Sequence, residues 1–314
     1  MQSTIVIINL FGAVALLLFG LAQVKDGVTR AFGSRLRTGL ASGTQSGLRS
    51  FAAGFLATIA LQSSTATALT VASFVERDLI RARMAQIVLL GANVGTAVTA
   101  FVVATGIEWL SPLLIIAGVA LQKGGSTARR GGGTALIGIG LMLLSLDLLS
   151  AATEPMRASP ALAAFIKLLD GAWPVAFALT AGLAIVSSSS LAVVVLVLSL
   201  AGTGILSTEL IIVLILGANL GGAIGPVLAT LSAPASARRI TTGNLVVRAV
   251  GCLIALPFVD YGAQGLSMLP LAREGLPVDA HLAFNIALAL LAWPFSGFLS
   301  DVMKRAIPAQ EDPD

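Results

Sequence analysis

The stretch Gln62-Ser63-Ser64-Thr65 places four adjacent amide and hydroxyl side chains in the middle of an apolar run. A second cluster, Ser187-Ser188-Ser189-Ser190, lies in an equally apolar setting in the other half of the chain. A polar group that enters hydrocarbon without a partner costs roughly 1–3 kcal/mol. Two such clusters therefore predict a binding site for a small, charged, hydrated solute.

The composition indicates an all-α polytopic membrane protein. Hydrophobic residues make up 56% of the chain and charged residues only 11%, and the mean hydropathy is +0.95. Soluble domains carry about 25% charged residues. The apolar run 5–21 has no basic segment before it, which favours a first transmembrane helix over a signal peptide. The net charge of +4 comes from basic residues between apolar runs, a pattern typical of membrane topology and lipid contact and not of nucleic-acid binding.

The inventory of reactive side chains argues against an enzyme. The single cysteine, Cys252, and the single histidine, His281, exclude a disulfide framework and a Cys/His metal site. No cluster of acidic, histidine or cysteine residues offers acid–base or nucleophilic chemistry. No P-loop pattern is present, so nucleotide hydrolysis within this chain is excluded as well. We expect no cofactor other than a coupling ion.

Both polar clusters are flanked by apolar segments too short to cross a bilayer, which takes about 20 residues. The segments 50–61 and 67–74 surround the first cluster, and 173–186 and 191–200 surround the second. Short apolar arms around a polar centre predict a re-entrant hairpin or a broken helix. Irregular backbone survives at membrane depth only where protein buries it or where it lines a wet cavity.

The remaining apolar runs predict membrane spans, at residues 4–23, 84–106, 109–121, 134–149, 210–231, 240–259 and 280–299. A Gly-rich basic stretch at 123–133 predicts a flexible linker between two halves. The predicted organisation is a first transmembrane repeat at 1–122, the linker at 123–133, a second repeat at 134–231, C-terminal helices at 232–306 and a disordered tail at 307–314.

The order of motifs indicates an internal duplication. Ser63 and Ser188 are 125 positions apart, and Asn93 and Asn219, each in a Gly-Ala-Asn tripeptide, are 126 apart. Repeated halves with broken segments at matching positions point to a transport site at the repeat interface. An odd number of crossings in each half would make the repeats inverted, with both clusters facing each other near the membrane midplane.

With these motifs the chain resembles the type II sodium/phosphate cotransporter family, which has bacterial members. That family carries a Gln-Ser-Ser signature twice, in two inverted repeats, each followed by a Gly-Ala-Asn-like motif in the next helix. The resemblance reaches from the first helix to about Lys304 and includes His281-Leu282-Ala283-Phe284-Asn285. It implies a multi-pass protein of the bacterial inner membrane that couples sodium to phosphate movement by alternating access.

The expected ligands follow from the chemistry of the two ions. Hydroxyls and helix N-termini can donate to phosphate, whereas sodium needs amide, hydroxyl and carbonyl oxygens. Thr65 and Ser190 are also expected to cap the helices that follow the clusters. The expected phosphate ligands are Ser63, Ser64, Thr65, Ser188, Ser189 and Ser190, and the expected sodium ligands are Gln62, Asn93, Thr96, Ser187 and Asn219.

Two departures from the family pattern concern the second half. Ser187 stands where the family has glutamine, and Gly222 stands where the first copy has Thr96. Cation ligands are therefore expected mainly in the first repeat. Arg248, with Asn244 one turn earlier, is a possible accessory to anion binding, since an intramembrane arginine is a functional candidate; snorkelling or pairing with a carboxylate is the alternative.

Several readings stay open at this stage. The same fold could move phosphate outward, carry another small oxyanion or use protons in place of sodium. A passive channel predicts a continuous polar stripe or a filter shared by a symmetric oligomer, and paired clusters in one chain fit occlusion better. The sequence leaves open the orientation in the membrane and the oligomeric state, with a homodimer as one option.

Overall fold

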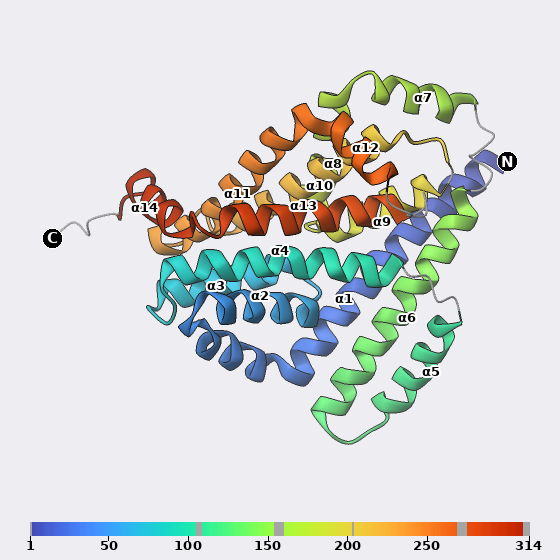
Figure 1. The fold of residues 1–314 in the computed structure, drawn as a ribbon. Helices are drawn as coiled ribbons and strands as arrows, with labels where there is room; N and C mark the ends of the chain where they lie inside the picture. The colour runs from blue at the N-terminus through green and yellow to red at the C-terminus, as the bar shows by residue number, and fades with distance from the viewer. Residues whose placement is uncertain (1, 105–108, 154–159, 203, 269–274, 310–314) are drawn as a thin grey trace.

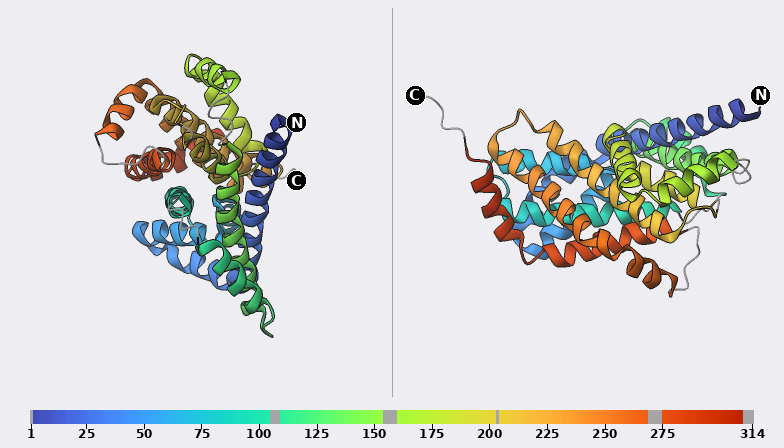
Figure 2. Two further views of the ribbon diagram at one scale, coloured as in Figure 1. Left: turned by 90° about the vertical axis from the view of Figure 1, so that its right-hand side faces the viewer. Right: turned by 90° about the horizontal axis from the view of Figure 1, so that it is seen from above.

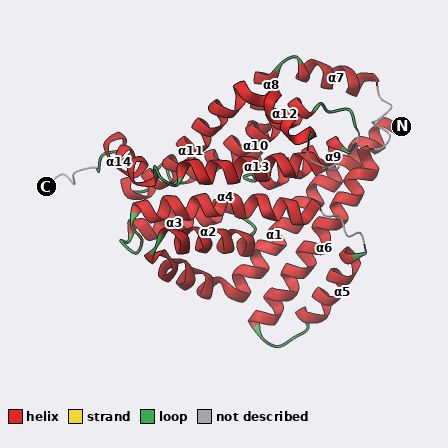
Figure 3. Cartoon of the chain, in the orientation of Figure 1, coloured by secondary structure: helices red, strands yellow, loops and turns green. Residues whose placement is uncertain are grey.

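The computed structural model describes residues 2–104, 109–153, 160–202, 204–268 and 275–309. All regular structure in these ranges is helical (Figure 3). The predicted tail at 307–314 falls for its last five residues, 310–314, outside the described part. The helices are α1 (Gln2–Ser42), α2 (Gly47–Leu61), α3 (Ser64–Glu76), α4 (Ala82–Ala104), α5 (Leu110–Gln122), α6 (Thr127–Thr153), α7 (Pro160–Asp170), α8 (Trp173–Val186), α9 (Ser190–Ala201), α10 (Thr208–Ala229), α11 (Ala235–Ala255), α12 (Val259–Ser267), α13 (Leu276–Ala292) and α14 (Ser296–Ala306).

Long apolar helices confirm the membrane class. Within the described residues, five helices are long and apolar enough to cross a membrane, or up to seven if each bent helix pair counts as one span. Figure 1 shows α4 and α13 side by side through the centre of the molecule. In the left panel of Figure 2, α4 is seen along its axis between the hairpin α2–α3 and the C-terminal helices. The start of α1 and α14 lie at opposite ends of the molecule (Figure 2).

Three sequence expectations are wrong in detail. Helix α5 has 13 residues, too few for the crossing expected at 109–121. The span expected at 280–299 is broken, because α13 and α14 meet at an angle of 81°. The stretch expected as a flexible linker becomes helical from Thr127 onward. Its glycines allow close packing: a Cβ on Gly131 would lie 2.6 Å from the Gly27 carbonyl oxygen of α1.

Matching glycines set the packing within the two halves. Gly91 of α4 lies against the Phe51 carbonyl oxygen of α2, and a Cβ there would collide with it. Gly217 of α10 lies in the same way against the Phe177 carbonyl oxygen of α8. Both partners in each half are 126 positions from their counterparts in the other half. The pairs α2–α4 and α8–α10 therefore repeat one packing arrangement and carry the two polar clusters.

Candidate functional site

The first polar cluster lies where α2 ends and α3 begins. Gln62 adopts left-handed backbone angles, φ 49° and ψ 31°, and this conformation breaks the helix. Ser63 returns to an extended conformation, and its Oγ accepts a hydrogen bond from the Ala66 backbone N–H at 3.1 Å. The side-chain Nε2 of Gln62 donates to the Ile59 carbonyl oxygen at 2.8 Å, a bond that does not use Oε1. Ser63 is thus the N-cap of α3.

The second cluster repeats this geometry. Ser188 has a left-handed φ of 51°, and Ser189 is extended, with its Oγ accepting from the Ala192 backbone N–H at 3.2 Å. By backbone conformation Gln62 corresponds to Ser188, 126 positions later, the spacing of the two asparagines. The correspondence of Gln62 with Ser187, expected from a spacing of 125, is wrong by one residue.

The identity of the capping residues also differs from the expectation. Thr65 and Ser190 were expected to cap the second arms, but Ser63 and Ser189 occupy the N-cap positions. Ser190 is the first residue of α9, and it is buried. In each cluster the capping hydroxyl uses a lone pair for the backbone N–H and keeps its own hydrogen for another acceptor.

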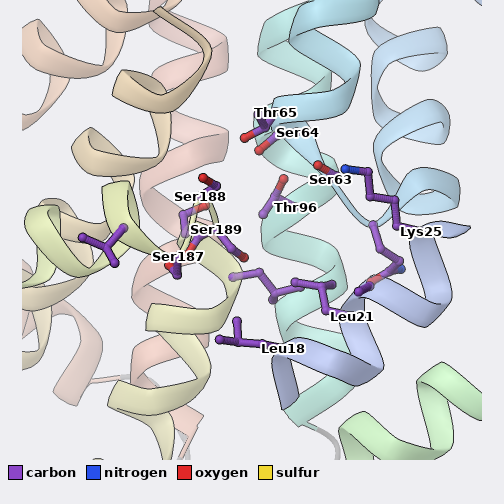
Figure 4. Close-up of a pocket in the computed structure, with 15 residues that line it drawn as sticks. Leu18, Leu21, Lys25, Ser63, Ser64, Thr65, Thr96, Ser187, Ser188 and Ser189 are labelled. Atoms are coloured by element: carbon purple, nitrogen blue, oxygen red, sulfur yellow. Dashed lines mark hydrogen bonds between the residues drawn. The ribbon is translucent and has the colours of Figure 1, made fainter. Parts of the chain in front are cut away.

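Both clusters face one cavity of about 350 Å³ (Figure 4). All six expected phosphate ligands line it, together with three of the five expected sodium ligands, Gln62, Thr96 and Ser187. The first N–H groups of a helix have no partner within the helix, and the helix dipole places positive charge there. The N-termini of α3 and α9 therefore meet at the cavity, in an arrangement suited to an anion.

Lys25 of α1 is a lining residue that the sequence reasoning missed. It lies on one helix face with Leu18, Leu21 and Ala22, all of which line the cavity. Figure 4 shows its ammonium group directed toward Ser63. Positions 18, 21, 22 and 25 are spaced so that they lie on one face of a helix. A lysine at the end of this apolar face was the sequence signal that could have predicted a charged lining residue. Lys25 supplies a fixed positive charge at the cavity.

The two remaining expected sodium ligands lie elsewhere, in a buried network around Arg248. The guanidinium donates to the Asn93 Oδ1 at 2.7 Å and to the Asn219 Oδ1 at 2.9 Å and backbone oxygen at 2.8 Å. Asn93 Nδ2 donates in turn to the Asn244 Oδ1 at 3.0 Å. Arg248 thus links α4 and α10 through the asparagines of the two Gly-Ala-Asn motifs.

His281 and Asn285 of α13 complete this network. Asn285 Nδ2 donates to the Asn219 Oδ1 at 3.0 Å, and His281 Nδ1 lies 2.9 Å from the Asn219 Nδ2. Both side chains are fully buried. The contacts among Arg248, the asparagines and His281 join residues on different helices. The network therefore fixes α4, α10, α11 and α13 relative to one another.

Known protein sequences resemble this chain over nearly all of its length. The family model described as Na+/Pi-cotransporter matches residues 16–151. The "Putative inorganic phosphate export protein YjbB" of Salmonella typhimurium is 37% identical over 98% of this chain and 57% of that protein. The protein of the same name in Escherichia coli (strain K12) is 37% identical over 92% of this chain and 53% of its own length.

A third relative is more distant in sequence. The "Uncharacterized protein YqeW" of Bacillus subtilis is 23% identical over 98% of this chain and 100% of its own length. The chain spans about half the length of the curated phosphate export relatives, at 57% and 53%. No solved structure matches the chain.

Proposed function

We propose that this chain, which matches the family model described as Na+/Pi-cotransporter over residues 16–151, is a secondary active transporter that moves inorganic phosphate across the bacterial inner membrane. The observation that carries this proposal is the meeting of both polar clusters, each at a helix N-terminus, in one cavity. The cavity offers hydroxyls, the N-terminal ends of two helices and the charge of Lys25. These are the groups that replace the hydration shell of a phosphate anion.

In this proposal the phosphate ligands are the hydroxyls and first N–H groups of α3 and α9. Ser63 and Ser189 each donate their free hydroxyl hydrogen to phosphate while they cap their helices. Ser64, Thr65, Ser188 and Ser190 provide the other contacts. A hydrogen bond to a charged group contributes about 1.5–3 kcal/mol, and several act together to offset the desolvation of the anion.

Sodium is the proposed coupling ion, bound mainly by the first half. Gln62 and Thr96 line the cavity from that half, and Ser187 lines it from the other. Asn93 and Asn219 have their side-chain oxygens on Arg248, and a guanidinium at hydrogen-bond distance repels a second cation. We therefore assign these two asparagines the role of holding Arg248 between α4 and α10.

The matching geometry of the two halves supports alternating access between inverted repeats. The hairpins α2–α3 and α8–α9 share the same backbone break, and their partner helices share the same glycine packing. Movement of one hairpin pair against the other around the cavity would open it to one side of the membrane at a time. The hydrogen-bond network around Arg248 joins α4 of the first half to α10 of the second half. It would therefore control how the two halves move relative to each other.

Outward movement of phosphate is the second candidate, favoured by the names of the longer relatives, which describe phosphate export. One experiment addresses both. Purified protein in proteoliposomes is assayed for uptake and for efflux of labelled phosphate, with a sodium gradient, with a proton gradient, and with neither. Absence of phosphate flux under every condition refutes transport of phosphate. Flux that follows the proton gradient alone, or that ignores sodium, refutes sodium coupling.

A further inference from the structure

A second polar pocket lies at the far end of the first hairpin. It has a volume of about 560 Å³ and is formed by the end of α3, the start of α4, the start of α11, and α14. Four cationic side chains and two carboxylates line it, so positive charge exceeds negative charge by two. These are Arg81, Arg83, Arg239 and Lys304, with Asp78 and Asp301.

The corresponding place in the second half holds a pocket of opposite character. This pocket, of about 330 Å³, is lined by residues of the connection from α9 to α10 and by the first turn of α10. Asp78 and Gly204, 126 positions apart, both have left-handed backbone angles, with φ of 56° and 76°. The same spacing pairs Arg83 with Glu209. The only charged side chain that lines the second pocket among the described residues is Glu209.

The two pockets open at opposite ends of the molecule. Leu276, the first residue of α13, lines the acidic pocket, and α14, which follows α13, lines the basic pocket. The 17 residues of α13 span about 25 Å at a rise of about 1.5 Å per residue. Figure 1 shows α14 and the start of α4 at one end and the start of α13 toward the other. This separation is close to the thickness of the hydrocarbon core, about 30 Å.

Each pocket is joined to the central cavity by one helix. The 13 residues of α3 run from Ser64, at the cavity, to Glu76, next to the basic pocket, a distance of about 20 Å. Helix α9 runs in the same way from Ser190 to Ala201 at the acidic pocket. The two pockets therefore occupy equivalent positions in the two halves, and they differ in the sign of their charge.

We propose that the basic pocket is a loading site for inorganic phosphate at one membrane face, and that the opposite face, which carries the acidic pocket, has no such site. This inference rests on the proposed transport of phosphate. The excess of two positive charges in the basic pocket raises the local concentration of anions and their association rate. Positive charge in the basic pocket does not alter the equilibrium of phosphate across the membrane, but it lowers the KM for phosphate on the same face.

The distribution of basic residues gives this face an orientation. Arg49 at the start of α2, Arg77 after α3, and Arg238 and Arg305 all lie at the end of the molecule that carries the basic pocket. Short loops rich in Lys and Arg remain on the cytoplasmic side. The loading face is then cytoplasmic, which matches the outward direction of the second candidate function.

The test compares phosphate transport from the two faces in vesicles of known orientation. The variant R81Q/R83Q should raise the KM for phosphate on the basic face about tenfold, the low end of charge steering, with kcat unchanged. The KM on the other face should stay constant, and the maximal rate from that face should fall by the same factor, because the equilibrium across the membrane does not change. The control R77Q removes the charge of an exposed arginine in the same loop that does not line the pocket, and should leave both values unchanged.

The complementary variant E209R places a cation in the acidic pocket and should lower the KM for phosphate on that face. An unchanged KM in R81Q/R83Q overturns the proposal, as does an equal increase on both faces. An effect that appears only in vesicles with anionic phospholipid, and is absent in phosphatidylcholine alone, overturns it in favour of a lipid headgroup site.

A binding measurement separates failure of this inference from failure of the proposed function. Labelled phosphate is titrated against purified protein in which S63G/S189G has removed the two capping hydroxyls of the central site. Residual binding that R81Q/R83Q abolishes supports the loading site even if wild-type protein shows no flux. Residual binding that R81Q/R83Q does not weaken, or no residual binding, overturns the loading site. Neither result contradicts the phosphate site in the central cavity.

Discussion

Replacement of Ser63 by glycine separates the two roles of that side chain. The Oγ accepts from the Ala66 backbone N–H and caps α3, while its hydrogen is available to phosphate. Serine to alanine at an N-cap costs about 1 kcal/mol, but serine to glycine costs only a few tenths. The variant Ser63→Gly therefore removes the ligand hydroxyl with little loss of helix stability, and the extended backbone of residue 63 accepts glycine without strain.

The expected loss of phosphate affinity follows from one hydrogen bond to a charged ligand. Such a bond contributes about 1.5–3 kcal/mol, and each 1.4 kcal/mol is a factor of ten in Kd. We expect Ser63→Gly to weaken phosphate binding about 10- to 100-fold. Ser189→Gly should have an effect of similar size, because Ser189 occupies the equivalent position in α9.

The assay is equilibrium binding of labelled phosphate to purified protein, paired with thermal unfolding of the same samples. Ser46→Gly is the matched control, because Ser46 caps α2 through the Arg49 N–H and lies outside the cavity. This control should match the stability of Ser63→Gly and keep wild-type affinity. If Ser63→Gly and Ser189→Gly both bind phosphate as wild type does, the assignment of the capping hydroxyls to phosphate is refuted.

Three further predictions concern the surroundings of the site. Arg248→Met removes hydrogen bonds of 2.7, 2.8 and 2.9 Å to the two asparagines and should lower the transport rate about tenfold or more. The unfolding temperature should stay near that of wild type, because the variant no longer buries a charge that has no carboxylate partner among these bonds. A wild-type rate of phosphate transport would contradict this prediction. Gly91→Ala drives a Cβ into the Phe51 carbonyl oxygen and should cost about 1–3 kcal/mol in thermal unfolding, whereas Gly225→Ala, with nothing within 4 Å, should be no less stable than wild type. Lys25→Gln should weaken phosphate binding by less than tenfold, because this lysine is exposed. The difference in Kd between variant and wild type should shrink in high salt. A difference that does not depend on salt would argue that Lys25 does not act through its charge.

The apolar runs and the position of the helix breaks could be predicted from the sequence. Residues 50–61 and 173–186 are too short to span, and the polar clusters that follow them interrupt the helices as expected. The bend between α13 and α14 was missed, although Pro294 stands between the two helices and a proline within a helical run ends or kinks the helix. The helical start of α6 was also hidden, since its glycines read as a linker until α1 supplies the surface against which they pack.

The sequence by itself determined the membrane class, the doubled clusters and the residue types available to bind an anion, because burial in lipid makes polar insertions costly wherever they occur. Only the tertiary structure decided the one-residue correction that pairs Gln62 with Ser188, because a left-handed backbone is a conformation and not a residue type. It also decided that Arg248 lies between Asn93 and Asn219. Those contacts join helices that are far apart in the chain, and only packing brings such positions within hydrogen-bond distance.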